Sequence, residues 1–244
     1  LIEIAGTAIF NLDGGERFDN TGLFDITAAS ALGELFVNGG TFNHNSGGIV
    51  QIGLGDALRF VGGDVRLVVS PDGMKDASAV VLPGVGAFDD CVNAMHRQEL
   101  LEASLQFIKS GRPFLGICVG YQAMFERSEE FDSSAAGLGL FAGRVVRFPD
   151  DQGLKIPQIG WNQIEIVQSE CPIFDGIENG SYVYFVHSFY PQPEDDSIAA
   201  CRTTYGVNFV SAVWQGNIFA TQFHPEKSQK VGLKILENFV KLAG

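Results

Sequence analysis

The 244-residue chain has few cysteines, few basic residues and no apolar run that predicts a transmembrane helix. Four cysteines in a chain of this length do not suggest a disulfide framework, so we expect a reducing, cytoplasmic setting. With 16 basic against 29 acidic residues and a net charge of −13, there is no basic stripe for a nucleic-acid partner. An uncharged stretch, residues 209–225, contains Gln, Asn, His and Pro and predicts two strands, so no membrane association is expected. Neither a phosphate-binding loop nor a metal-ligand cluster occurs, and we predict no cofactor and no metal.

The first 55 residues also lack lysine, proline and cysteine, and Arg17 is their one basic residue. They are rich in Gly, Asn, Thr and Phe, and short apolar bursts are separated by Gly/Asn turns. This pattern predicts a β-meander or one to three rungs of a β-solenoid. We therefore divide the chain into an atypical β-rich segment, residues 1–48, and a second domain, residues 49–244.

From residue 56 onward the chain alternates apolar strands with helices, and strand pairs dominate its later part. This order predicts an α/β fold with a largely parallel, helix-covered central sheet and an antiparallel extension. The predicted strands are residues 64–69, 79–82, 113–117, 143–148, 158–167, 181–186, 198–202, 207–214 and 217–223. The predicted helices are residues 88–110, with a break near residues 97–100, and residues 229–242.

One cysteine stands in a local pattern that predicts a nucleophile. Cys118 follows an apolar strand, is flanked by Gly116 and Gly120, and precedes a helix-like stretch, residues 121–125. Glycines permit the close backbone approach and unusual dihedrals of such a strand–turn–helix, and a helix N-terminus favours a thiolate. A lone cysteine is more often a small buried hydrophobe, but the flanking glycines favour the catalytic interpretation. Three further cysteines lack this context and are interpreted as structural: Cys91, Cys171 and Cys201.

A general base for this nucleophile is predicted about a hundred residues later. His224 and Glu226 directly follow an apolar strand, residues 217–223. Nucleophile, imidazole and orienting carboxylate are the parts of a Cys-His-Glu triad. His187 is a weaker candidate, because a strand-end histidine with a structural hydrogen bond is at least as good an interpretation.

Five segments carry a resemblance to a known family. Residues 116–130 (GICVGYQAMFERSEE) and 221–228 (TQFHPEKS) resemble the class I glutamine amidotransferases. Three more strings narrow the resemblance to the glutaminase subunits of imidazole glycerol phosphate synthases: PGVGAF at 83–88, GWN at 160–162 and YFVHSFY at 184–190. The resemblance runs from about residue 56 to the C-terminus.

This resemblance implies glutamine hydrolysis, with ammonia delivered to a (β/α)8 cyclase subunit that makes imidazole glycerol phosphate in histidine biosynthesis. Cys118 would attack the glutamine carboxamide, His224 would transfer protons and Glu226 would orient the imidazole. The family pattern also assigns an oxyanion hole to Gly84, Val85 and Val119. It assigns glutamine binding to Gln122, Glu130, Ser188 and Phe189, and the partner interface to Lys227 and Trp161.

Several positions depart from the family pattern. Tyr121, Gln158 and Ala220 stand where Met or Leu, His and Gly are expected; we expect Tyr121 to lie under the partner or the glutamine pocket. The first central strand and the turn after it are missing from their usual place. Our hypothesis is that residues 49–52 replace this strand, and that Asp56 caps a short helix after it.

Two other functions stay open at this point. One is a glutaminase that serves a different synthase. The other is an inactive fusion that has lost the central strand, or a β-rich surface-binding module that carries a vestigial domain. The strings at residues 226–228 and 160–162 argue against the first alternative, and only the composition of residues 1–55 motivates the second.

Overall fold

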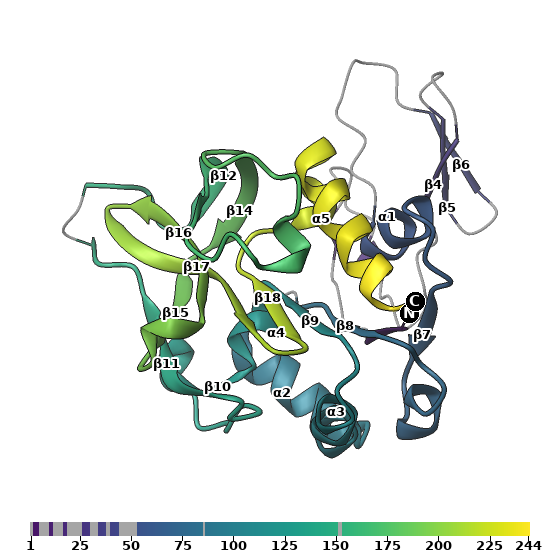
Figure 1. The fold of residues 1–244 in the computed structure, drawn as a ribbon, viewed down its shortest axis with the longest axis horizontal. Coiled ribbons are helices and arrows are strands. Elements are labelled where there is room, and N and C mark those ends of the chain that lie inside the picture. The colour runs from purple at the N-terminus through teal and green to yellow at the C-terminus, as the bar shows by residue number, and fades with distance from the viewer. Residues whose placement is uncertain are drawn as a thin grey trace.

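A computed structural model of the chain describes residues 53–84, 86–150 and 153–244, together with the backbone of six short strands before residue 44. A mixed sheet runs through the molecule in the order β13-β16-β17-β18-β9-β8-β1-β7 (Figure 1). Its strands are β1 (Ile2–Ile4), β7 (Arg66–Val68), β8 (Val80–Leu82), β9 (Phe114–Ile117), β13 (Glu165–Ile166), β16 (Ala199–Tyr205), β17 (Val207–Gln215) and β18 (Ile218–Thr221).

The predicted fold class is confirmed by the strand directions. β7, β1, β8, β9 and β18 pair in parallel, whereas β18, β17, β16 and β13 pair antiparallel. The parallel strands β8 and β9 are buried along their whole length, as sheets covered on both faces require. The change of direction at β18 gives the antiparallel extension.

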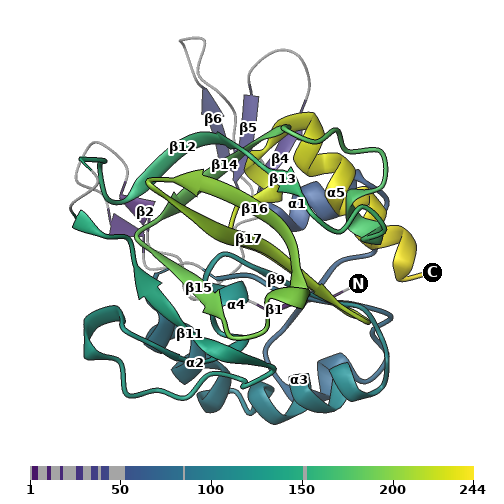
Figure 2. The ribbon, with the colours of Figure 1, turned by 60° about the vertical axis from the view of Figure 1, so that its left-hand side comes forward.

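Helices cover both faces of this sheet (Figure 2). α1 (Leu54–Phe60) and α5 (Gln229–Leu242) lie together on one face, and α2 (Phe88–Arg97) and α3 (Leu100–Lys109) lie on the other. The predicted break between α2 and α3 occurs at Glu99, whose φ of 58° interrupts the helical path. The N-cap of α1 is Gly53, so the prediction of Asp56 as the cap is wrong; Asp56 lies in the first turn.

An interior strand position, next to the edge strand β7, is filled by a segment that we expected elsewhere. β1 lies between β8 and β7, and its backbone pairs in parallel with both. The segment Ile2–Ile4 thus belongs to the large sheet, although its composition suggested a β-rich appendage. Residues 49–52, our candidate for this position, lie outside the described residues. The domain boundary between residues 48 and 49 stays a prediction.

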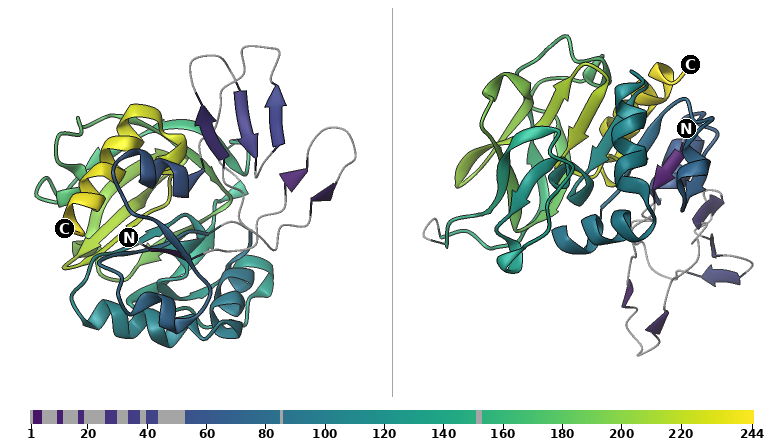
Figure 3. Two further views of the ribbon diagram at one scale, coloured as in Figure 1. Left: turned by 90° about the vertical axis from the view of Figure 1, so that its right-hand side faces the viewer. Right: turned by 90° about the horizontal axis from the view of Figure 1, so that it is seen from below.

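Smaller sheets complete the fold. One contains β10 (Phe125–Ser128), β11 (Phe141–Arg147) and β15 (Phe189–Pro193), and another pairs β12 (Gln158–Gln163) with β14 (Tyr182–His187). Near the N-terminus, β2 (Phe10–Asn11) pairs with β3 (Arg17–Phe18), and β4 (Ile26–Ala29), β5 (Glu34–Val37) and β6 (Gly40–Asn43) form a separate antiparallel sheet (Figure 3).

None of the helices among the described residues has the length and apolar character needed to cross a membrane.

Candidate active site

The candidate nucleophile sits at a strained turn between β9 and α4 (Val119–Gln122). Cys118 has φ 56° and ψ −111°, a conformation that L-residues rarely adopt and that costs on the order of 1–3 kcal/mol. A Cβ on Gly120 would lie 2.1 Å from the Leu82 carbonyl oxygen, and one on Gly116 would lie 2.8 Å from the Gly120 carbonyl oxygen. Both glycines are therefore needed for backbone packing around the strained cysteine.

The helix after this turn is shorter than predicted. α4 ends at Gln122, and Phe125, which we placed in the helix, begins strand β10. Leu138 and Leu140 donate backbone hydrogen bonds to the Ala123 and Met124 carbonyls, so tertiary bonds replace the next helical turn. The single turn still places the Val119 and Gly120 backbone directly beside Cys118.

The predicted base and its carboxylate are paired in the structure. His224 Nδ1 lies 2.7 Å from Glu226 Oε1, and both side chains are buried. Burial alone would lower the pKa of His224, but the negative charge of Glu226, the Cys118 sulphur and hydrogen bonds to both outweigh it and raise the pKa. Burial likewise opposes the charge of Glu226, but the neighbouring imidazole lowers the pKa of this carboxyl. The arrangement favours a carboxylate–imidazolium pair next to the sulphur.

A cavity of about 270 Å³ opens over these residues. Cys118 and His224 line it together with the four residues that the family pattern assigns to glutamine: Gln122, Glu130, Ser188 and Phe189. Glu130 accepts a hydrogen bond from the Phe88 backbone N–H at 2.8 Å, and burial raises the pKa of its carboxyl. A carboxylate on this wall suits the ammonium group of an amino acid.

The predicted oxyanion hole is partly described. Val119 and Gly84 line the cavity, and a Cβ on Gly84 would lie 2.2 Å from the Gly120 nitrogen. The loop after β8 and the nucleophile turn are therefore in direct backbone contact. Val85 lies outside the described residues, so its assignment stays a prediction.

Known proteins resemble this chain over most of its length. A family model described as glutamine amidotransferase class-I matches residues 64–243. The chain belongs to the class I glutamine amidotransferases. The imidazole glycerol phosphate synthase subunit HisH of Syntrophotalea carbinolica is 49% identical over 202 residues, which cover 78% of this chain and 97% of that protein. HisH of Geobacter sulfurreducens is 45% identical over 202 residues, covering 78% and 96%. The expected resemblance to this subunit family is thus confirmed.

Solved structures show the same amidotransferase fold. A putative GMP synthase protein from Thermoplasma acidophilum has a TM-score of 0.56 at 26% identity, covering 78% of this chain and 85% of that one. PurLQS from Thermotoga maritima has a TM-score of 0.59 at 21% identity, covering 77% and 88%. These similarities confirm the fold class.

The departures from the amidotransferase pattern lie in the core. Tyr121 is fully buried, contacts Phe125 edge-on and donates a hydrogen bond to the Val210 carbonyl at 3.2 Å. Its side chain thus lies in the core beneath the nucleophile turn and does not itself line the cavity, so its expected place under the glutamine pocket or the partner stays a prediction. Ala220 is fully buried in β18, and Gln158 is buried at the start of β12.

The structure adds one residue to the site that the sequence did not single out, Gln222, and describes the surroundings of His187, the weaker histidine candidate. Gln222 is fully buried, and its Nε2 donates a hydrogen bond to Cys118 Sγ at 3.7 Å. His187 lines the cavity, and burial lowers its pKa to about 3, so its ring is neutral. Its Nδ1 lies 2.8 Å from the Phe189 carbonyl oxygen, which makes Nδ1 the protonated nitrogen and leaves Nε2 as a buried acceptor without a partner. For Gln222, its place two residues before His224 was the available signal.

The other cysteines do not resemble Cys118. Cys91, Cys171 and Cys201 are buried and free. Burial is the main cause that raises the pKa of Cys91 and of Cys171 to about 12, and that of Cys201 also lies well above its usual value. Their thiols are held neutral, which agrees with the structural interpretation.

Proposed function

We propose that this protein hydrolyses glutamine to glutamate and ammonia with a Cys-His-Glu triad, and supplies the ammonia to a cyclase subunit that makes imidazole glycerol phosphate. The observation that carries the proposal is the strained Cys118 at a cavity lined by His224, with Glu226 bonded to the far side of that imidazole. The HisH proteins, which share almost half their residues with this chain, support the choice of product. An inactive fusion finds no support in these similarities.

The chemistry follows from the groups present. The Cys118 thiolate attacks the carboxamide carbon of glutamine, and the developing charge on the carboxamide oxygen is stabilised by backbone N–H groups of the nucleophile turn. The His224 imidazolium gives its proton to the departing nitrogen, which leaves as ammonia. A γ-glutamyl thioester remains on Cys118. Neutral His224 then takes a proton from water, which attacks the thioester and releases glutamate. Glu226 keeps the Nε2 edge of the ring directed to the reaction.

Glutamate release by the purified chain tests this function. We expect release that rises on adding the cyclase subunit together with its ribonucleotide ligand, and that falls to background in Cys118→Ala. A Cys91→Ala variant serves as a control, because this buried thiol has no place in the reaction. Release that survives Cys118→Ala, or a folded chain that never releases glutamate with its partner, would overturn the proposal.

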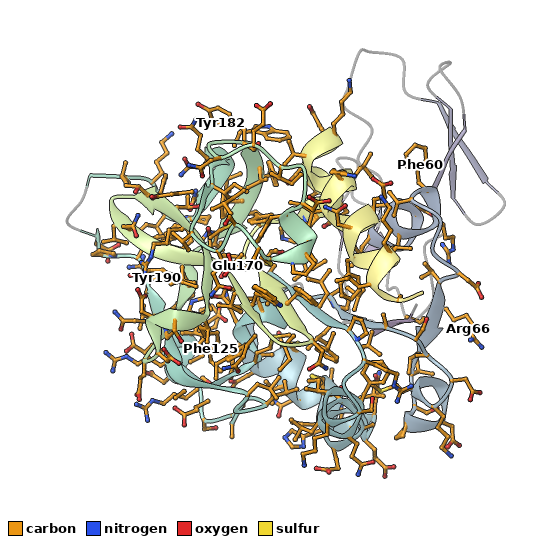
Figure 4. The ribbon with its side chains drawn as sticks, viewed as in Figure 1. Phe60, Arg66, Phe125, Glu170, Tyr182 and Tyr190 are labelled. Atoms are coloured by element: carbon orange, nitrogen blue, oxygen red, sulfur yellow. The ribbon has the colours of Figure 1, made fainter. Side chains whose placement is uncertain are left out.

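The cyclase subunit is proposed to dock on the outward face of the β12–β14 pair. Ile159, Trp161 and Tyr182 are 63%, 43% and 55% exposed, and their backbones lie in register with Val186, Tyr184 and Gln163, respectively. This face borders the cavity, because Val186, which pairs with Ile159, lines the cavity; Lys227, from the turn after His224, lines it too. Figure 4 shows Tyr182 at the outer edge of the molecule. Large exposed apolar patches of this kind are typical of protein interfaces.

A charged substitution on this face tests the docking site. Trp161→Glu is expected to lower partner-stimulated glutamate release at least tenfold and to leave partner-free release unchanged, since Trp161 lies outside the cavity lining. Phe60→Glu is a matched control, because Phe60 is also an exposed aromatic, 74% exposed, but lies on α1 (Figure 4). Equal stimulation of both variants would rule out this docking face.

A further inference from the structure

We propose that Gln222 is a further catalytic residue, whose side-chain amide holds the Cys118 sulphur by donating a hydrogen bond to it, and that Gln122 fixes the direction of this amide. The inference deepens the proposed glutaminase function and rests on it. Gln222 Nε2 lies 3.7 Å from Cys118 Sγ, and the Gln222 side chain is fully buried. A donor to a reacting atom in a dry site has a larger electrostatic effect than one in water.

The direction of the amide follows from its neighbours. Gln122 Nε2 lies 3.0 Å from the Phe189 carbonyl oxygen, which only accepts, so the NH₂ group of Gln122 must lie there. The same NH₂ group lies 3.2 Å from Gln222 Oε1 and donates its second hydrogen to it. The oxygen of Gln222 is thereby assigned, and its NH₂ group must face the sulphur. A flipped amide would place two NH₂ groups against each other and an oxygen against the thiolate.

Gln222 complements His224 because it cannot titrate. The imidazolium stabilises the thiolate by charge, but that charge disappears when His224 gives its proton to the departing nitrogen. The neutral amide of Gln222 keeps one donor on the sulphur before and after that transfer. The backbone of Gln222 is fixed as well, since its N–H donates to the Ser211 carbonyl at 2.8 Å. Each group in the hydrogen-bonded series that leads from the Phe189 carbonyl to the Cys118 sulphur is therefore held by at least one hydrogen bond.

Alkylation of Cys118 by iodoacetamide, followed by mass spectrometry across pH, tests the inference without glutamine or partner. The readout is the pH of half-maximal rate, which belongs to the Cys118–His224 pair as a whole. The maximal rate is less useful, because a thiolate that is more strongly stabilised is also a weaker nucleophile. Labelling in Cys118→Ala gives the background from the three other buried cysteines.

Three variants probe the chain of amides. Gln222→Met keeps the length of the side chain but removes the donor, and we expect the half-maximal pH to rise by about one unit, equivalent to about 1.4 kcal/mol. Gln222→Glu keeps an acceptor for Gln122 and turns an oxygen toward the thiolate, so the rise is at least as large. Gln122→Met frees the Gln222 amide to rotate and gives a smaller rise. We also expect the glutaminase kcat of Gln222→Met to fall about tenfold. The urea unfolding midpoint, measured on the same preparation, verifies that the variant is folded.

The outcomes separate the two proposals. Half-maximal pH values that are equal in the wild type and in every folded variant would overturn the role of Gln222 and leave the glutaminase function standing. If wild-type Cys118 is alkylated no faster than Cys91, Cys171 and Cys201, the proposed glutaminase function itself is contradicted. If both Gln222 variants fail to fold, Gln122→Met decides. An unchanged pH of half-maximal alkylation in this variant, whose Gln222 amide can rotate, would contradict the inference.

Discussion

Individual residues in the site are each held by neighbours that set their protonation and direction. His224 lies between Glu226 and Cys118, and His187, at the end of β14, is kept neutral by burial. Of the two histidines that line the cavity, His224 is thus charged and His187 neutral, because among the described residues His224 alone has a carboxylate partner. The pKa of a buried imidazole depends on its neighbours more than on its residue type.

Replacing Glu226 by Gln should make the stability of the protein less dependent on pH. The folded pKa of His224 is raised, so its contribution is complete below the unfolded value of about 6.5 and disappears as pH rises through the folded value. The folded pKa of Glu226 is lowered, so its contribution is complete above the unfolded value of about 4.3 and disappears as pH falls through the folded value. We expect Glu226→Gln to lower the free energy of unfolding by about 2 kcal/mol near pH 5.5 and by less at pH 10.

Urea unfolding of the wild type and Glu226→Gln at these two pH values measures the difference. Glu237→Gln is a control, because Glu237 pairs with Lys234 and Lys241 on the surface. A constant difference between wild type and Glu226→Gln from pH 5.5 to pH 10 would contradict the assigned charge pair.

Among the structural elements, the turn between β9 and α4 combines strain with close backbone packing. The loop after β8 presses Gly84 against Val119 and Gly120, and β8 places the Leu82 carbonyl under Gly120. The strained cysteine is therefore held by two neighbouring strand ends at the carboxyl edge of a parallel sheet, where ligands bind in open α/β folds. A short helix suffices here, because the flanking backbone contacts, more than helix length, fix the turn.

A methyl group at Gly120 should disrupt this turn. Gly120→Ala would place Cβ 2.1 Å from the Leu82 carbonyl oxygen, and a backbone clash of this kind is expected to cost about 3 kcal/mol or more. Gly53→Ala is the matched control: within the described part of the chain its Cβ would meet Asp56 Oδ2 at 3.7 Å, an ordinary contact, and a loss below about 1 kcal/mol is expected there. Equal urea midpoints for the two variants would show that the turn can relax around the methyl group.

At the scale of the whole molecule, the large sheet depends on both ends of the described chain. β1 pairs with β7 and β8, whereas β18, more than 200 residues later, pairs with β9. Without β1, the facing edges of β7 and β8 would present backbone groups without partners, each costing about 1–3 kcal/mol when buried. Since total stability is about 5–15 kcal/mol, the loss of one interior strand is enough to threaten the fold.

Proline at position 3 tests the place of β1 between β7 and β8. Glu3→Pro removes a backbone N–H from a strand that pairs on both sides, so we expect a lower free energy of unfolding by about 1–3 kcal/mol or an insoluble chain. Glu3→Thr is the control, because it keeps the N–H and suits a strand. Wild-type stability of Glu3→Pro in urea would show that Ile2–Ile4 contributes nothing to the sheet.

Local patterns in the sequence were enough to predict the α/β class, most element positions, the nucleophile turn and the pairing of His224 with Glu226. These features depend on residues close together in the chain: glycines around Cys118, an apolar run before His224, and a helix whose bounds, Gln229–Leu242, match the prediction. Only the tertiary structure decided that Ile2–Ile4 takes the position between β8 and β7, because such a short burst carries no information about its partners. The contacts of Gln222 with Gln122 and Cys118 likewise join residues 100 and 104 positions apart, and only the folded sheet, which brings the ends of β9 and β18 together, places these side chains in contact.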